Sequence, residues 1–140
     1  MQILKEKSRA KSQITFDEDF NVPDAKPDVG RLIQYKGRIS MDDVHLADGK
    51  GILRGDLQVD ILYVGEENGI ISSITAKLPF EETLNLKDIV NGDKLCLKWE
   101  IEDLTIRLIH SRKLNIKAVV TFYAVVDELA GIRLPVAVDD

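Results

Sequence analysis

The sequence predicts an all-β protein, an antiparallel β-sandwich built of long, bulged hairpins. Ile and Val together number 27 among the 140 residues, against 8 Ala; such branched side chains pack well on sheets but lose rotamer freedom in helices. Apolar and polar residues alternate over long stretches, which is the period of a half-buried strand. No segment shows ten or more residues of helical periodicity, and turn signals recur regularly. Both observations are typical of a sandwich or barrel, and we favour the sandwich.

Four segments carry the alternation. Between Leu53 and Tyr63 the odd positions are apolar or Gly, and the even positions are polar until Leu62. Between Leu114 and Phe122 the even positions are apolar. Two further faces have the same period: Ile33, Tyr35, Gly37, Ile39 and Met41, and Leu95, Leu97, Trp99 and Ile101. We therefore expect four aromatic side chains in the core, Tyr35, Tyr63, Trp99 and Phe122. Tyr123 falls on an outward position.

Two acidic pairs interrupt this alternation. After Asp42-Asp43 and again after Glu102-Asp103, the apolar residues resume on the opposite phase. A single inserted residue turns every later side chain to the other face, so each pair predicts a β-bulge. Bulged strand, turn and long strand occur twice, over 31–65 and 94–126, and this repetition predicts an internal duplication.

Turn signals place the remaining elements. Asp48-Gly49 is a dipeptide that tight hairpins favour. The other expected elements are a turn near 110–112, a strand over 70–80 broken by Pro79, a short strand over 83–86 and a helical turn over 87–90.

We divide the chain into a basic N-terminal arm (1–13), a sandwich domain (14–126) and a C-terminal segment (127–140) with an edge strand. The arm carries a charge of +3 and the rest of the chain −8. This polarity predicts an intermolecular contact, although a solvated terminus has the same composition. The expected self-assembly residues are Lys5, Lys7, Arg9, Lys11, Ile14, Phe16, Ile132, Leu134, Val136 and Val138.

Composition excludes several classes of protein. The net charge of −5 and the pI near 5.1 argue against a nucleic-acid binder, which needs a basic face. The longest apolar runs fall far short of the ~20 residues of a membrane span, and the charged first residues do not form a secretory signal. Cys96 is the one cysteine, so we expect a free thiol in a strand and a reducing compartment.

Enzyme chemistry finds no support in the motifs. The sequence holds no G-x-S-x-G, no H-E-x-x-H and no glycine-rich phosphate loop. His45 and His110 lie near hairpin turns, where exposed histidines are ordinary, and the neighbouring Glu81 and Glu82 point to opposite faces of a strand. We expect no catalytic residue and no cofactor.

A partial calcium-loop pattern occurs near the N-terminus. Asp17, Asp19, Asn21 and Asp28 fall at positions 1, 3, 5 and 12 of the template. Val22 stands where the template needs glycine, so the extended connector that Pro23 and Pro27 predict is the stronger interpretation, with no metal site.

The same connector carries a resemblance to a known family. The stretch Val22-Pro23-Asp24-Ala25-Lys26-Pro27-Asp28 and the later Arg112-Lys113-Leu114 stand in this order with Gly37-Arg38-Ile39, Gly55, Ile61-Leu62-Tyr63, Leu78-Pro79-Phe80 and Ile101-Glu102-Asp103 between them. Over residues 14–126 the chain resembles the SPOCS domain of spore-coat assembly proteins of the SipL type, from clostridia and their relatives. The motif residues are Val22, Pro23, Asp24, Lys26, Pro27, Asp28, Arg112 and Lys113.

The resemblance implies a non-enzymatic domain that helps to build the spore envelope. It implies a location in the mother-cell cytoplasm at the forespore surface, with spore-coat morphogenetic proteins as partners, among them the ATPase of the coat's basement layer. Relatives of that type carry further SPOCS copies and a C-terminal LysM docking module, which this sequence lacks. We therefore expect an isolated domain or a short single-domain member.

Two functions follow as hypotheses. The first is a structural protein that self-associates, by strand exchange into oligomers or filaments, or docks onto coat proteins. The second is a ligand-binding sandwich for wall glycans, for which Tyr123 is the outward aromatic residue.

Overall fold

The computed structural model describes residues 2–86 and 94–131 of the chain. Within these residues it contains strands and turns and no helix. The strands, in chain order, are β1 (Gln2–Asn21), β2 (Val29–Ala47), β3 (Lys50–Gly65), β4 (Ile71–Asn85), β5 (Lys94–His110) and β6 (Lys113–Gly131).

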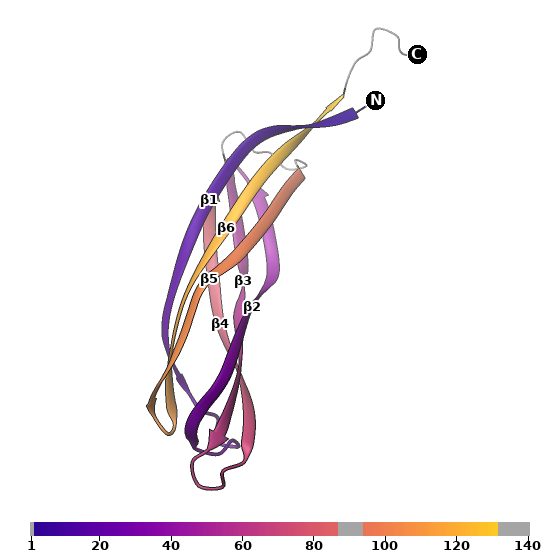
Figure 1. The fold of residues 1–140 in the computed structure, drawn as a ribbon. Coiled ribbons are helices and arrows are strands. Elements are labelled where there is room, and N and C mark those ends of the chain that lie inside the picture. Colours follow the sequence, from indigo (N-terminus) through magenta and orange to yellow (C-terminus); the bar gives the residue numbers. More distant parts are fainter. Residues whose placement is uncertain (1, 87–93, 132–140) are drawn as a thin grey trace.

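The strands form two antiparallel three-stranded sheets that pack face to face (Figure 1). One sheet has the order β1-β6-β5, which we call sheet A, and the other has the order β2-β3-β4, which we call sheet B. Strand β1 leaves sheet A through the connector of residues 22–28, and the chain then builds the whole of sheet B before it returns. The predicted all-β antiparallel sandwich is confirmed.

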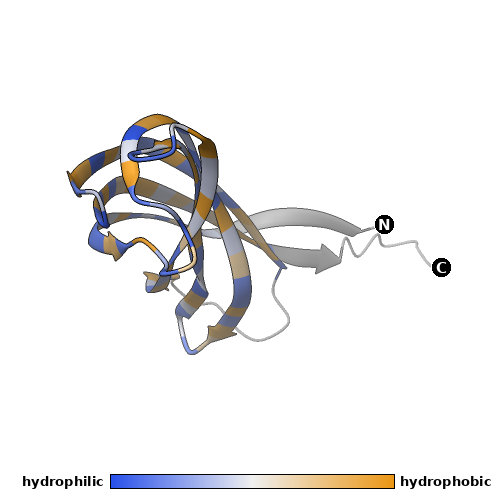
Figure 2. Cartoon of the chain, turned by 90° about the horizontal axis from the view of Figure 1, so that it is seen from below, coloured by the Kyte–Doolittle hydropathy of each residue, from blue (hydrophilic) through white to orange (hydrophobic). Residues whose placement is uncertain are grey.

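The core lies between the central strands of the two sheets, β3 and β6. Odd-numbered residues of β3 from Leu53 to Tyr63 are buried, Gly55 included, and so are even-numbered residues of β6 from Leu114 to Val126. Figure 2 shows the resulting alternation of hydrophobic and hydrophilic residues along the strands. Aromatic contacts join the two sheets, because the centre of the Phe80 ring lies 6.1 Å from that of Phe16 and 5.4 Å from that of Phe122.

Both predicted β-bulges are present. The register of β2 against β3 shifts between Met41 and Asp43, and the register of β5 against β6 shifts between Ile101 and Asp103. Asp42 and Glu102 are therefore the extra residues. The two bulged strands cross the sandwich near each other, since a Cβ added to Gly37 of β2 would lie 3.3 Å from Ile101 Cδ1. Each sheet is a bulged hairpin plus one further strand; the duplication of sequence stays a prediction.

Both predicted hairpin turns are also present. Asp48 and Gly49 have φ angles of 48° and 76°, the left-handed conformation of a two-residue turn that suits the twist of the strands. The second turn consists of residues 111 and 112, because His110 pairs with Lys113.

Strand β4 differs from the prediction. It runs unbroken through Pro79 and includes residues 83–85, so the predicted break and the separate short strand are wrong. β4 lies at the edge of sheet B, where a residue without an N–H is tolerated. The helical turn predicted over 87–90 lies outside the described residues.

Two aromatic residues predicted for the core are exposed. Tyr63 and Phe122 are fully buried, but Tyr35 is 36% exposed and Trp99 is 40% exposed. Tyr35 pairs with the inward-facing Ile61 of β3, and Trp99 pairs with the inward-facing Phe122 of β6, so both side chains point inward as predicted. They lie on the edge strands β2 and β5, where the opposite sheet covers an inward side chain only in part.

The expected arm and the sandwich domain meet inside one strand. β1 runs from Gln2 to Asn21 and pairs with β6 along its length, with one register shift between Glu6 and Ser8. At the far end, residues 2–5 and 128–131 form a two-stranded ribbon that extends past the start of β5 (Figure 1). Among the described residues, no helix is long and apolar enough to cross a membrane.

Gly55 tests the packing opposite the first bulge. A Cβ at this position would lie 2.2 Å from the carbonyl oxygen of Ser40 and 3.1 Å from Cα of Met41, and neither backbone atom can move aside. We expect Gly55→Ala to lower the free energy of unfolding by about 2 kcal/mol or more, measured by chemical denaturation. Gly69→Ala is the control: with φ at 63° and no atom within 4 Å, it should cost about 1 kcal/mol. Equal losses would contradict the packing argument.

Candidate functional site

The connector of residues 22–28 is held at one end of the sandwich by the guanidinium of Arg112. Nη1 donates to the carbonyl oxygen of Lys26 at 2.7 Å and to Oδ1 of Asp28 at 2.9 Å. Nη2 donates to the carbonyl oxygens of Val22 at 3.1 Å and Pro23 at 2.9 Å. One side chain therefore binds four acceptors of the connector, an arrangement that needs the planar fork of arginine.

Backbone hydrogen bonds fix both ends of the connector to the β5–β6 turn. The N–H of Val22 donates to the carbonyl oxygen of Arg112 at 2.9 Å, and the N–H of Val29 donates to that of Ser111 at 2.8 Å. The connector thus begins and ends on two neighbouring residues of the same turn.

The β3–β4 end of sheet B holds the connector from the other side. The hydroxyl of Tyr63 donates to the carbonyl oxygen of Pro27 at 2.8 Å, and the N–H of Glu66 donates to that of Asp28 at 2.9 Å. Burial raises the pKa of Tyr63, which keeps the phenol protonated as a donor. The connector is therefore bound by both sheets at once.

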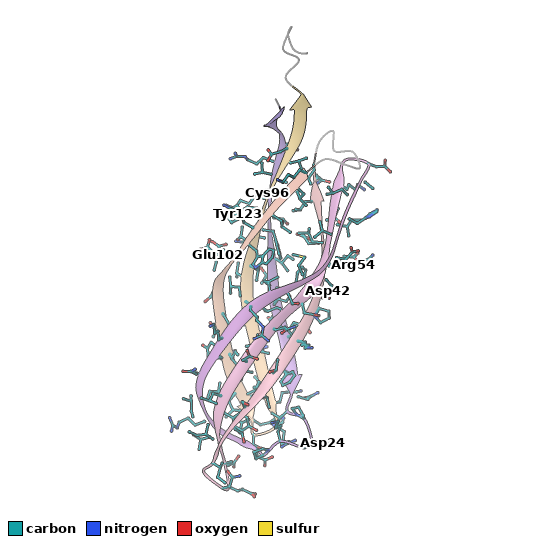
Figure 3. The ribbon with its side chains drawn as sticks, turned by 90° about the vertical axis from the view of Figure 1, so that its right-hand side faces the viewer. Asp24, Asp42, Arg54, Cys96, Glu102 and Tyr123 are labelled. Carbon is teal, nitrogen blue, oxygen red and sulfur yellow. The ribbon has the colours of Figure 1, made fainter. Side chains whose placement is uncertain are left out.

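The structure brings together most of the predicted motif residues. Backbone or side-chain atoms of Val22, Pro23, Lys26, Pro27, Asp28 and Arg112 form the clamp just described. Asp24 is exposed in the turn closed by the Lys26 N–H and the Pro23 carbonyl, and it points away from the sheets at the lower end of Figure 3. Lys113 begins β6, opposite Asn21. These contacts join the connector to the β5–β6 turn and to sheet B.

The residues of the calcium-loop pattern do not converge. Asp17 and Asp19 both accept from Nδ2 of Asn115, at 3.0 Å each, whereas Asp28 pairs with Arg112 and Asn21 lies at the end of β1. Among the described residues, no group of three or more His, Cys, Asp or Glu side chains could hold a metal ion.

The predicted self-assembly residues fall into four sets. Arg9 and Lys11 are exposed on β1, whereas Ile14 and Phe16 of the same strand pack in the core. Lys5 and Lys7 belong to β1 by their backbone alone, because the structure does not describe their side chains. The alternating residues Ile132, Leu134, Val136 and Val138 lie outside the described residues.

Tyr123 lies on the outer face of sheet A, between side chains of the two neighbouring strands. Lys11 on β1 and Lys98 on β5 both pair with this residue of β6, and Lys11 Nζ lies 5.6 Å from the centre of the ring. Two shallow depressions of about 230 and 330 Å³ adjoin the tyrosine, one extending to Cys96 and the other to Arg9. Tyr123, Cys96 and Glu102 lie along this sheet in Figure 3, away from Arg54 and Asp42 of sheet B.

The bulge residue Glu102 organises a second group on this face. Its carboxylate accepts from the hydroxyl of Thr121, which is fully buried, and from Nε2 of Gln13 at 3.1 Å. These two donors hold the pKa of Glu102 below its usual value, the threonine having the larger effect. All three strands of sheet A are thereby joined at one level. The acidic pair in the sequence indicated the bulge but not these partners.

The outer face of sheet B carries a comparable polar group. Asp60 accepts from Arg38 and, at 2.8 Å, from the hydroxyl of Thr75, and the same arginine donates to Gln58 at 2.7 Å. The threonine and the arginine together lower the pKa of Asp60. Both members of the ion pair are exposed, so the pair contributes little to stability.

The described histidines are exposed, as predicted. His45 lies near the end of β2, and Nδ1 of His110 accepts from the N–H of Arg112 at 3.1 Å, which shapes the turn. Glu81 and Glu82 have partners on opposite sides of β4, Arg54 on the outer face and Ser12 across the sandwich.

Comparison with known proteins identifies the family. The family model described as SipL, SPOCS domain, matches residues 28–109, more than half of the chain. The chain belongs to the SipL SPOCS domain family. The match includes all of β2, β3 and β4, and β5 except for His110; the connector before Asp28 and the Arg112-Lys113 pair lie just outside it. No curated protein and no solved structure matched.

Membership fixes the function at a coarse level. SPOCS domains are non-catalytic, are associated with sporulation and have a role in protein interaction. In this SPOCS domain the connector is hydrogen-bonded to both sheets.

Arg112 tests the clamp. An ammonium group retains the charge but has three N–H donors on one nitrogen in place of the fork of the guanidinium, so we expect Arg112→Lys to lower the free energy of unfolding by about 2–3 kcal/mol. Chemical denaturation followed by circular dichroism measures the loss. Lys113→Ala is the control, with an expected change within about 0.5 kcal/mol. If Arg112→Lys is as stable as the native chain, the clamp does not hold the sheets together.

Proposed function

We propose that this SPOCS domain is a non-enzymatic structural protein of the bacterial spore envelope. It acts through protein–protein contacts, by self-association into oligomers or filaments or by docking onto spore-coat morphogenetic proteins. Its place is the mother-cell cytoplasm at the forespore surface. The family, with its association with sporulation, supports this proposal.

The observation that carries the proposal is the open form of both sheets. The sheet orders leave β1 and β5 at the edges of sheet A and β2 and β4 at the edges of sheet B. An edge strand presents a row of unpaired N–H and C=O groups, onto which a further strand can be added. The chain therefore offers backbone hydrogen bonds to a partner without any change of fold.

Self-association is measured directly from the mass in solution. We expect analytical ultracentrifugation over a concentration series to show species that are multiples of 15.7 kDa, with electron micrographs distinguishing small oligomers from filaments. A monomer at every concentration would contradict self-association. Docking is measured separately, as recruitment of a fluorescent fusion to the forespore surface of a sporulating cell, and a diffuse signal there would contradict it.

A wall-glycan ligand is the second proposed function, and the surroundings of Tyr123 favour it. The ring is 37% exposed between two lysines and borders both depressions of the outer face of sheet A. An exposed aromatic ring beside polar groups is a common platform for sugars.

For this second function we expect a glycan-array signal that Tyr123→Ala abolishes. Tyr35→Ala, which removes an equally exposed tyrosine from sheet B, should leave the signal unchanged. Loss of signal in both variants, or in neither, would contradict a site at Tyr123.

A further inference from the structure

The four edge strands differ in how well they could receive another strand. β2 has three register shifts and β5 has two, and such bulges twist an edge away from a partner. β4 has no shift but contains Pro79, which cannot donate to a ladder. β1 is regular from Ser8 to Asn21 and contains no proline. Among the described strands, β1 therefore has the longest uninterrupted edge.

The outward side chains of β1 have an ordered pattern of charge. Ile14 and Phe16 face the core, so the odd-numbered residues around them face outward, and these are exposed. In chain order they are Arg9, Lys11, Gln13, Thr15, Asp17 and Asp19. The strand is thus basic at one end, neutral in the middle and acidic at the other end.

This pattern is complementary to itself. When two copies of β1 lie antiparallel about Ile14, residues whose numbers are equally far from 14 face each other. Lys11 then lies opposite Asp17 of the second copy, and Arg9 lies opposite Asp19. A two-fold axis repeats both pairs, and opposite charges directly across an antiparallel ladder are favourable. The bulge before Ser8 and the end of β1 at Asn21 limit the ladder at matching positions.

The charged groups are already held in place within one copy. Nδ2 of Asn115 donates to both Asp17 and Asp19, at 3.0 Å each, and Lys11 lies over the ring of Tyr123. A carboxylate has capacity for further donors while it accepts from an amide. Side chains that are ordered before association lose less entropy when the pair forms.

We propose that β1 is the interface between two copies of this chain, which pair antiparallel about Ile14 and merge their A sheets into one six-stranded sheet. The proposal rests on the self-association proposed above and names its surface. Because the contact is isologous it forms a closed dimer, and longer assemblies must use another edge.

Charge reversal tests this geometry. Lys11→Glu places two carboxylates opposite each other at two symmetric positions, and Asp17→Lys does the same with two ammonium groups. We expect each variant alone to dimerise roughly tenfold or more weakly than the native chain, measured by analytical ultracentrifugation. Mixed in equal amounts, the two variants restore both pairs. A heterodimer should therefore appear in native mass spectrometry at the native affinity.

Lys98→Glu is the matched control. The substitution changes the net charge by the same amount, and Lys98 also flanks Tyr123. Lys98 lies on β5, at the edge of sheet A opposite to β1, so this variant should dimerise like the native chain. Its mixture with Asp17→Lys has the same charges as the first mixture but should leave the Lys98→Glu homodimer predominant. Circular dichroism confirms that every variant is folded.

Each outcome separates the two proposals. Loss of the dimer in both single variants with recovery in the first mixture supports the β1 interface. If the native chain associates and Lys11→Glu associates equally well, the β1 interface is wrong while self-association stands. If the native chain is monomeric throughout, self-association fails together with the interface, and recruitment to the forespore surface alone decides the docking function.

Discussion

The attachment of the connector to both sheets is the interaction on which the rest of the sandwich depends. Among the described strands, no hairpin joins the two sheets, and residues 22–28 connect β1 of sheet A to β2 of sheet B. Arg112 binds this segment from sheet A, while Tyr63 and the backbone at Glu66 bind it from sheet B. The relative position of the two sheets at this end is therefore set by hydrogen bonds of defined direction, whereas apolar packing alone would permit sliding.

Much of the fold follows from local patterns in the sequence. Alternation identifies the buried faces of β3 and β6, an extra acidic residue in each bulged strand marks the change of phase, and Asp48-Gly49 specifies the hairpin. Tyr35 and Trp99 show where local patterns end. Period tells which way a side chain points, but coverage depends on the position of the strand within its sheet, and sheet order is a property of the whole chain.

The site was predictable in its residues and not in its contacts. The motif around the two prolines and Arg112 could be recognised as a set, but the hydrogen bonds between them join residues 84 to 90 positions apart. The charge asymmetry of the first residues was also visible in the sequence. That Ile14 and Phe16 would face inward, leaving a basic and an acidic stretch on one exposed edge, required the pairing of β1 with β6.

That pairing also has a consequence for how the protein reaches its native state. Of the described strands, β1 is made first, and its backbone pairs with β6, which is made last; Val22 and its partner Arg112 lie 90 residues apart. Chains with such distant contacts fold slowly, because a long loop must close before any ladder forms. Sheet B, made of consecutive hairpins, is complete before sheet A can begin. During synthesis β1 therefore has no partner strand on either edge until the ribosome has made β6.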